Sequence, residues 1–215
     1  MTDFKIMKYS PQLKALSFFL ALLPLARLFY GAFTESLGAN PIEYIIRDLG
    51  TWGLTFLLIT LTITPLRRIT NWNWLLRFRR MFGLFAFFYV CLHFTSYIWW
   101  DQFFDWEAIW KDIVKRPFIT VGMFTFLMLL PLALTSTNGM IKRLGARRWQ
   151  LLHRLVYPIA ICGVLHYWWL VKRDLTKPFI YASILAILLG FRLVYKYMEK
   201  RAEKSVSKYP VSVAN

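Results

Sequence analysis

Apolar residues gather into six long runs along the chain, at 13–33, 52–69, 82–100, 118–135, 151–171 and 178–198. Charged residues, proline or glycine bound each run. A helix needs about 20 apolar residues to cross the hydrocarbon core of a bilayer. The pattern therefore predicts an all-α polytopic membrane protein, a six-helix transmembrane bundle with short connections. We expect residues 1–215 to form one transmembrane domain, because no connection is long enough to fold alone.

The composition supports this fold class. Hydrophobic residues make up 58% of the chain and charged residues only 18%, whereas a soluble domain is about 45–50% apolar. These values exclude a disordered chain and a disulfide scaffold. Cys91 and Cys162 both lie inside apolar runs, so no disulfide framework is indicated. The first run is too long for a signal peptide and lacks a small-residue cleavage site, so we expect a retained span.

The charge of the chain is strongly basic, with a formal net charge of +16. In a soluble protein this would suggest nucleic-acid binding. When the basic residues at the ends of the first, second and last runs are included, the N-terminal end, the second and fourth connections and the C-terminal tail carry 17 Lys and Arg, against 7 in the other connections. Cytoplasmic loops of membrane proteins collect such residues. The distribution therefore predicts that both termini are cytoplasmic, and it explains the charge without nucleic acid. The longest outer connection, 101–117, is expected to form a short amphipathic helix.

Three histidines, His93, His153 and His166, all lie inside the apolar runs. An ionisable side chain in hydrocarbon is costly and usually marks a functional site. The third and fifth spans run in the same direction, so their residues can be compared by depth. At about 1.5 Å per residue, His93 lies about 18 Å and His166 about 24 Å from the inner end, in the outer half of a core about 30 Å thick. His153 lies only about 4–5 Å from that end.

Two imidazoles at similar depth on co-directional helices predict a flat cofactor held from both faces. Haem iron accepts two axial nitrogens in this way, and bundle cores hold such cofactors. Zinc or copper is the alternative metal; zinc requires four close ligands, to which Cys91 and Cys162 are candidates. We expect no acidic residue at this depth, which favours haem. A core histidine bonded to a neighbouring hydroxyl or carbonyl is the structural alternative.

His153 predicts a second cofactor position near the inner face. The residues at its level on the third span are Arg79 and Arg80, and Arg79 lies 14 residues before His93 on the same helix face. A guanidinium stays protonated and is a poor axial ligand. We therefore expect Arg79 to hold a propionate or another anionic edge of a cofactor. The sequence does not determine the rotation between the His153 and His166 side chains around the helix axis, because Pro158 between them can distort the helix.

Besides Arg67 and Arg68 at the end of the second run, three further arginines lie within the predicted spans. Arg27 is at about the depth of the histidine pair, and it either binds a haem propionate or extends to the outer interface. Arg154 and Arg192 lie nearer the inner boundary, where we expect their side chains to extend towards the headgroups.

Several short stretches in chain order carry a family resemblance: LGANP at 37–41, ITPLR at 63–67, RRMFGL at 79–84, LHFTSY at 92–97 and TST at 135–137, followed by Leu144-Gly145, Trp149, Leu152-His153 and Val156-Tyr157. Together they resemble the haem-binding membrane subunits of periplasmic methionine sulfoxide reductase systems, the MsrQ or YedZ family. This family belongs to the wider ferric reductase-like transmembrane group.

The resemblance implies an electron-transfer subunit in the bacterial inner membrane. Electrons would come from the quinone pool or a cytosolic flavin reductase and pass to a periplasmic molybdenum-cofactor subunit that reduces methionine sulfoxide in proteins. The implied cofactors are haem b, in one or two copies, and FMN, with no catalytic residue in this chain. His93 and His166 match the family's haem pair and His153 its third histidine, whereas Arg79 stands where the wider group has a fourth. The basic residues available to an FMN phosphate are Arg77, Arg79, Arg80, Arg147 and Arg148.

Two other functions compete with this interpretation. A stand-alone ferric or other metal reductase would need a separate electron donor, because the sequence shows no flavin or nicotinamide domain. A transporter or membrane scaffold with incidental histidines is the non-redox alternative. Transporters tend to have broken helices and repeated halves, and the sequence shows no internal repeat.

Overall fold

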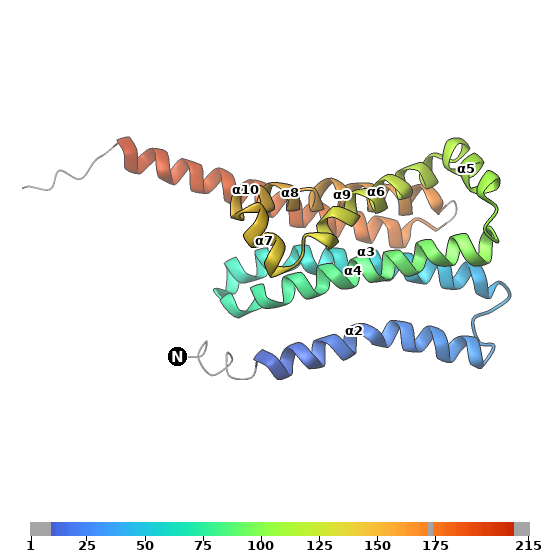
Figure 1. Ribbon diagram of the computed structural model, residues 1–215. Coiled ribbons are helices and arrows are strands. Elements are labelled where there is room, and N and C mark those ends of the chain that lie inside the picture. The colour runs from blue at the N-terminus through green and yellow to red at the C-terminus, as the bar shows by residue number, and fades with distance from the viewer. Residues whose placement is uncertain (1–9, 172–173, 209–215) are drawn as a thin grey trace, which may run out of the picture.

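The computed structural model describes residues 10–171 and 174–208, and every regular element within them is helical (Figure 1). In chain order the elements are α2 (Ser10–Phe33), α3 (Pro41–Thr70), a 3-10 turn (Asn73–Leu75), α4 (Leu76–Ser96), a π-helical turn (Tyr97–Asp101), α5 (Trp106–Lys115), α6 (Pro117–Leu134), α7 (Asn138–Leu144), α8 (Ala146–His153), α9 (Val156–Leu170) and α10 (Thr176–Lys208). The all-α prediction is confirmed. Four basic residues of the charge distribution, Lys5, Lys8, Lys172 and Arg173, lie outside the described residues.

Five helices in the described part of the chain are long and apolar enough to cross a membrane: α2, α3, α4 with its π-helical turn, α6 and α10. The fifth predicted span, 151–171, differs from the prediction because it is not one continuous helix. It is divided between α8, which ends at His153, and α9, which has only 15 residues. The two segments still follow one another along the bundle (Figure 1).

Pro158 explains the break between α8 and α9. Proline has no N–H, so Pro158 cannot donate to the carbonyl of Arg154, and its ring crowds that carbonyl. The chain bridges the position with tighter i to i−3 bonds, from Arg154 N to Leu151 O (3.1 Å) and from Tyr157 N to Arg154 O (3.1 Å). The helix distortion that the sequence allowed at Pro158 is therefore present in the structure.

α3 is the central helix of the bundle. Within the most apolar window of α3, 56% of the residues are buried, against 17–28% in the other four long helices. α3 packs most extensively against α4 and also contacts α2, α9 and α10. α6 packs against α9 as a second antiparallel pair, and α4 contacts α6. The histidine-bearing helices α4 and α9 are therefore each paired with a preceding helix.

α3 begins at Pro41, well before the predicted start at residue 52. Asn40 caps the helix: its Oδ1 accepts from the backbone N–H of Glu43 (3.2 Å), and its Nδ2 donates to the Glu43 carboxylate (3.0 Å). Proline at the first helical position needs no hydrogen-bond partner. Gly38, with φ +87°, provides the left-handed backbone that precedes the cap. The LGANP stretch is thus a helix-start signal, and the helix continues through polar residues that the apolar run excludes.

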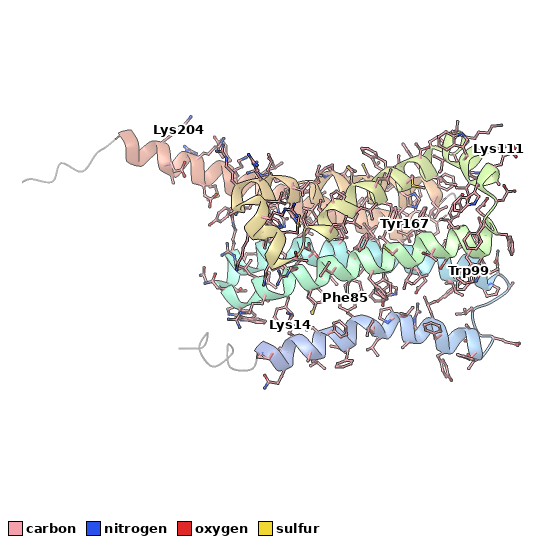
Figure 2. All side chains as sticks on the ribbon, in the orientation of Figure 1. Lys14, Phe85, Trp99, Lys111, Tyr167 and Lys204 are labelled. Atoms are coloured by element: carbon pink, nitrogen blue, oxygen red, sulfur yellow. The ribbon has the colours of Figure 1, made fainter. Side chains whose placement is uncertain are left out.

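The described ends of the chain lie at the same end of the bundle. Figure 2 shows Lys14 and Lys204 towards that end and Lys111 at the opposite one. α4 and α9 both run away from the end that carries Lys14 (Figure 1). The arrangement agrees with an even number of crossings, and the cytoplasmic location of this end remains a prediction of the charge distribution.

The connection 101–117 forms the predicted amphipathic helix, α5. Asp105 caps it, accepting from the N–H of Ala108 at 3.0 Å. Ile109 is buried, whereas Trp106 and Trp110 are exposed. The hydroxyl of Tyr97 donates to Asp112 Oδ2 at 3.3 Å, which ties α5 to the end of α4.

Arg192 on α10 does not extend towards the headgroups, which corrects the sequence-based expectation. Its guanidinium donates to the carbonyl of Leu61 on α3 and to that of Leu188 (2.7 Å). Pro65, four residues after Leu61, has no N–H to offer to the Leu61 carbonyl in the helix. A polar backbone group in a membrane interior must be satisfied inside the protein. Arg192 therefore supplies the donor that Pro65 removes.

We expect Arg192→Leu to lower the free energy of unfolding by about 1–3 kcal/mol, because it leaves the Leu61 carbonyl buried without a donor. Adding Pro65→Ala should recover most of that loss, since an alanine at this position restores the helical N–H. Unfolding in mixed detergent micelles measures both effects, with Pro65→Ala alone as the control. If the double variant is no more stable than Arg192→Leu, the compensation between Pro65 and Arg192 is wrong.

Candidate functional site

His93 on α4 and His166 on α9 lie next to each other inside the bundle. Their ring centroids are 6.1 Å apart, and the ring planes make an angle of 75°. Tyr167, which follows His166, lies in the body of the bundle in Figure 2. The structure thus places the two rings at one level on co-directional helices, as the depth comparison predicted.

Each ring is anchored by a backbone carbonyl of the helix that precedes it in its pair. His93 Nδ1 lies 2.8 Å from the carbonyl oxygen of Ile46 on α3, and His166 Nδ1 lies 2.6 Å from that of Phe118 on α6. A carbonyl oxygen only accepts, so Nδ1 carries the proton in both rings. The lone pair of each imidazole is therefore on Nε2, which is the atom available to a metal.

The spacing of the two rings fits axial ligation of one metal. A metal–imidazole bond is about 2 Å long, and the ring centroid lies about 1 Å behind the nitrogen, so two imidazoles on opposite sides of one ion have centroids about 6 Å apart. Both side chains are half-buried rather than fully enclosed. Nδ1–H to carbonyl bonds are the usual outer contacts that orient metal-binding histidines. The arrangement fits a planar cofactor that brings its own equatorial ligands, as haem does.

The tetrahedral alternative lacks ligands. In the part of the chain that the structure describes, no three His, Cys, Asp or Glu side chains gather closely enough to hold a metal ion. Cys91 and Cys162 are half-buried free thiols. A structural zinc site requires four such ligands, so the paired histidines favour haem over zinc.

Arg27 on α2 forms an ion pair with Asp48 on α3, with Nη2 and Oδ1 2.6 Å apart. The sequence predicts that Arg27 either binds a haem propionate or extends to the outer interface. In the structure it pairs with a protein carboxylate instead. Asp48 lies inside α3, so the expectation that no acidic residue falls at this depth is wrong. The second carboxylate oxygen, Oδ2, is buried and has no hydrogen-bond partner among the described residues. The side chain of Arg27 remains 54% exposed on the outside of the bundle.

His153 lies about 20 Å from His166 along the chain's helical path, at the end of α8. Its Nε2 is 3.1 Å from the Thr135 hydroxyl, and its ring stacks on Trp149 with centroids 3.9 Å apart. Trp149 Nε1 donates to the Thr135 carbonyl at 2.8 Å. These contacts make His153 part of a hydrogen-bonded unit that joins α8 to the end of α6.

Arg79 and Arg80 lie at the level of His153, as the spacing predicted. The Arg79 guanidinium is exposed and interacts electrostatically with the His153 ring. Arg80 donates to Asn138 Oδ1 on α7 at 2.6 Å. The structure therefore brings Arg79 and His153 together near the end of the bundle that carries Lys14, and neither residue joins the His93–His166 pair.

The groups that anchor the two histidines could not be predicted from the sequence. The anchors are the main-chain oxygens of Ile46 and Phe118, and a backbone carbonyl has no residue identity that a motif can reveal. The role of Thr135 was closer to detection, because the TST stretch was already singled out. Its hydroxyl partner could not be inferred, since the pairing depends on the turn between α6 and α8.

Comparison with known proteins identifies the group to which this arrangement is related. A family model described as "Ferric reductase like transmembrane component" matches residues 49–164. The matched region runs from α3 to α9 and includes His93 and His153, ending two residues before His166.

Several relatives named "Protein-methionine-sulfoxide reductase heme-binding subunit MsrQ" match nearly the whole chain. The relative from Herminiimonas arsenicoxydans is 55% identical over 92% of this chain and 93% of its own length. That from Rhodospirillum rubrum is 55% identical over 96% and 100%, and that from Azospira oryzae 57% identical over 85% and 78%. The similarity therefore extends over most of the chain.

Proposed function

This chain belongs to the ferric reductase-like transmembrane family and, within it, to the MsrQ heme-binding subunits, and we propose that it carries electrons to a methionine sulfoxide reductase. The observation that supports the proposal is the pair of imidazoles, 6.1 Å apart and each anchored through Nδ1. His93 and His166 would hold haem b through Nε2. The bound haem would supply reversible one-electron redox chemistry.

The residues of this chain would hold the cofactor and orient the two histidines that bind it. The carbonyls of Ile46 and Phe118 fix the Nδ1–H tautomers of His93 and His166, so that Nε2 stays available. The aromatic rings of Phe94 and Phe126, 4.7 Å apart, join α4 to α6 beside this level. An apolar surrounding of this kind keeps water from a redox centre and influences its potential.

Electron balance defines the partners. Reduction of a sulfoxide to a sulfide takes two electrons and two protons and releases one water molecule. A quinol supplies both electrons, and a cytosolic flavin reductase is the other donor that the resemblance implies. We propose that the electrons pass singly to a molybdenum-cofactor subunit in the periplasm, where the sulfoxide bond is broken. The chain would then act in the bacterial inner membrane without a catalytic residue of its own.

We propose one haem rather than two. The Nε2 atom of His153 is already 3.1 Å from the Thr135 hydroxyl, and its charged neighbour is Arg79 rather than an imidazole. FMN, which the resemblance implies, would bind at this same end, where Arg79, Arg147 and Arg148 are exposed. Their positive charge suits a phosphate.

Purified protein should contain one b-type haem per chain, and His93→Ala or His166→Ala should lower the haem content at least about tenfold. Each variant removes one of the two Nε2 atoms that would hold the haem. Haem and flavin content per polypeptide measure this, with His153→Ala as the matched control that keeps the haem. Added imidazole should restore the spectrum of a folded His93→Ala variant. Haem loss in His153→Ala alone would show that the wrong histidines were paired.

In membrane vesicles, the reduced absorption band formed by a quinol should disappear when the periplasmic molybdoenzyme and a methionine-sulfoxide peptide are added together. The stopped-flow absorbance measures electron delivery to that partner. Vesicles with His166→Ala should show no such change. Equally fast reoxidation by a ferric chelate without the molybdoenzyme would instead support a stand-alone metal reductase.

A further inference from the structure

Two glycines lie against the rings of the histidine pair. A Cβ atom built on Gly50 of α3 would lie 3.0 Å from His93 Nδ1, and one built on Gly122 of α6 would lie 2.8 Å from His166 Nδ1. In both cases the next nearest atom is Cε1 of the same ring, at 3.1 Å and 2.9 Å. The atoms nearest to each of these two Cβ positions therefore belong to the imidazole ring of the neighbouring histidine.

The position of each glycine in its helix explains this contact. Gly50 comes four residues after Ile46, and Gly122 four residues after Phe118. In an α-helix the carbonyl of a residue faces the N–H of the fourth residue along, and Cβ atoms tilt towards the N-terminus. A side chain at position 50 or 122 would therefore stand beside the carbonyl that the imidazole approaches. Glycine leaves that carbonyl open to a second donor.

The same unit occurs twice. Each copy has a helical carbonyl, a glycine four residues later and a histidine on the paired helix, and the histidine follows the glycine by 43 residues in α3–α4 and by 44 in α6–α9. The sequence shows no internal repeat, because the residues around the two units differ. The correspondence is one of backbone geometry.

We propose that Gly50 and Gly122 are positioning residues that set the reduction potential of the bound haem by keeping both Nδ1–H to carbonyl bonds short. The inference rests on the proposed haem function. A strong hydrogen bond from Nδ1 makes the imidazole a better electron donor, which stabilises the oxidised iron and lowers its potential. A methyl group at either glycine displaces the ring from its carbonyl. The potential then rises and the ligand bond weakens.

Two other glycines provide matched controls. Gly53 lies one turn from Gly50 on α3, and its Cβ would meet Val90 Cγ2 at 2.7 Å. Gly53→Ala therefore introduces a clash at least as close between the same two helices, without touching a histidine. In the part of the chain that the structure describes, Gly190 on α10 has no atom within 4 Å of its Cβ position, so Gly190→Ala controls for the change in backbone freedom.

The test is a spectroelectrochemical titration of the haem in Gly50→Ala, Gly122→Ala, Gly53→Ala and Gly190→Ala, with thermal unfolding measured in parallel. We expect both histidine-contacting variants to have a higher midpoint potential and about tenfold weaker haem binding. The effect should be larger at Gly122, where the contact is closer. Gly53→Ala should lower thermal stability but leave the midpoint potential unchanged, and Gly190→Ala should change neither.

Unchanged potentials in loaded Gly50→Ala and Gly122→Ala, or an equal rise in Gly53→Ala, would overturn the inference. If Gly122→Ala does not fold, Gly50→Ala decides, because its contact with the ring is longer. Failure of the proposed function is a separate result: the unaltered protein would then bind no haem, or would keep it without His93 and His166. Haem binding by both histidines with no response to the glycines refutes only the positioning role.

Discussion

The hydrogen bond from each histidine Nδ1 to a main-chain carbonyl is the contact on which the rest of this structure depends. It requires α4 to lie close to α3 and α9 close to α6, and it requires the two pairs to meet so that the rings of His93 and His166 are 6.1 Å apart. Imidazoles without these bonds would be free to change tautomer and orientation. α3 anchors one ring and also contacts α2, α9 and α10 at the centre of the bundle.

A membrane interior makes every exposed backbone polar group costly, and this bundle contains several helix irregularities. At two of them the structure shows how the free carbonyl is satisfied within the protein. Pro65 leaves the Leu61 carbonyl without its helical donor, and Arg192 supplies another. Pro158 divides α8 from α9, and tighter turns bridge the break. The Pro65 position and the histidine anchors thus use the same chemistry: a main-chain carbonyl of one helix accepts a hydrogen bond from a side chain of a neighbouring helix.

Two levels of the bundle differ in what they can bind. The His93–His166 level offers two nitrogens with free lone pairs and half-buried rings. At the His153 level, by contrast, the histidine Nε2 lies at hydrogen-bond distance from the Thr135 hydroxyl, Trp149 stacks on the ring, and the positive charge of Arg79 interacts with it. A guanidinium attracts anions rather than iron. The chain therefore separates a level suited to a metal from a level suited to a phosphate or carboxylate.

The sequence by itself determined the all-α membrane fold, the surface helix α5 and the three histidines as the candidate site, because hydrophobic run length and isolated ionisable residues depend only on local composition. Depth along a helix also follows from residue number, so the pairing of His93 with His166 was accessible. The Arg27–Asp48 ion pair, the Arg192 contact and the anchoring carbonyls were decided only by the tertiary structure. Those contacts depend on the rotation and closeness of packed helices, which residue spacing leaves undetermined. The same holds for Gly50 and Gly122, because only the tertiary structure shows that a histidine ring lies where their side chains would be.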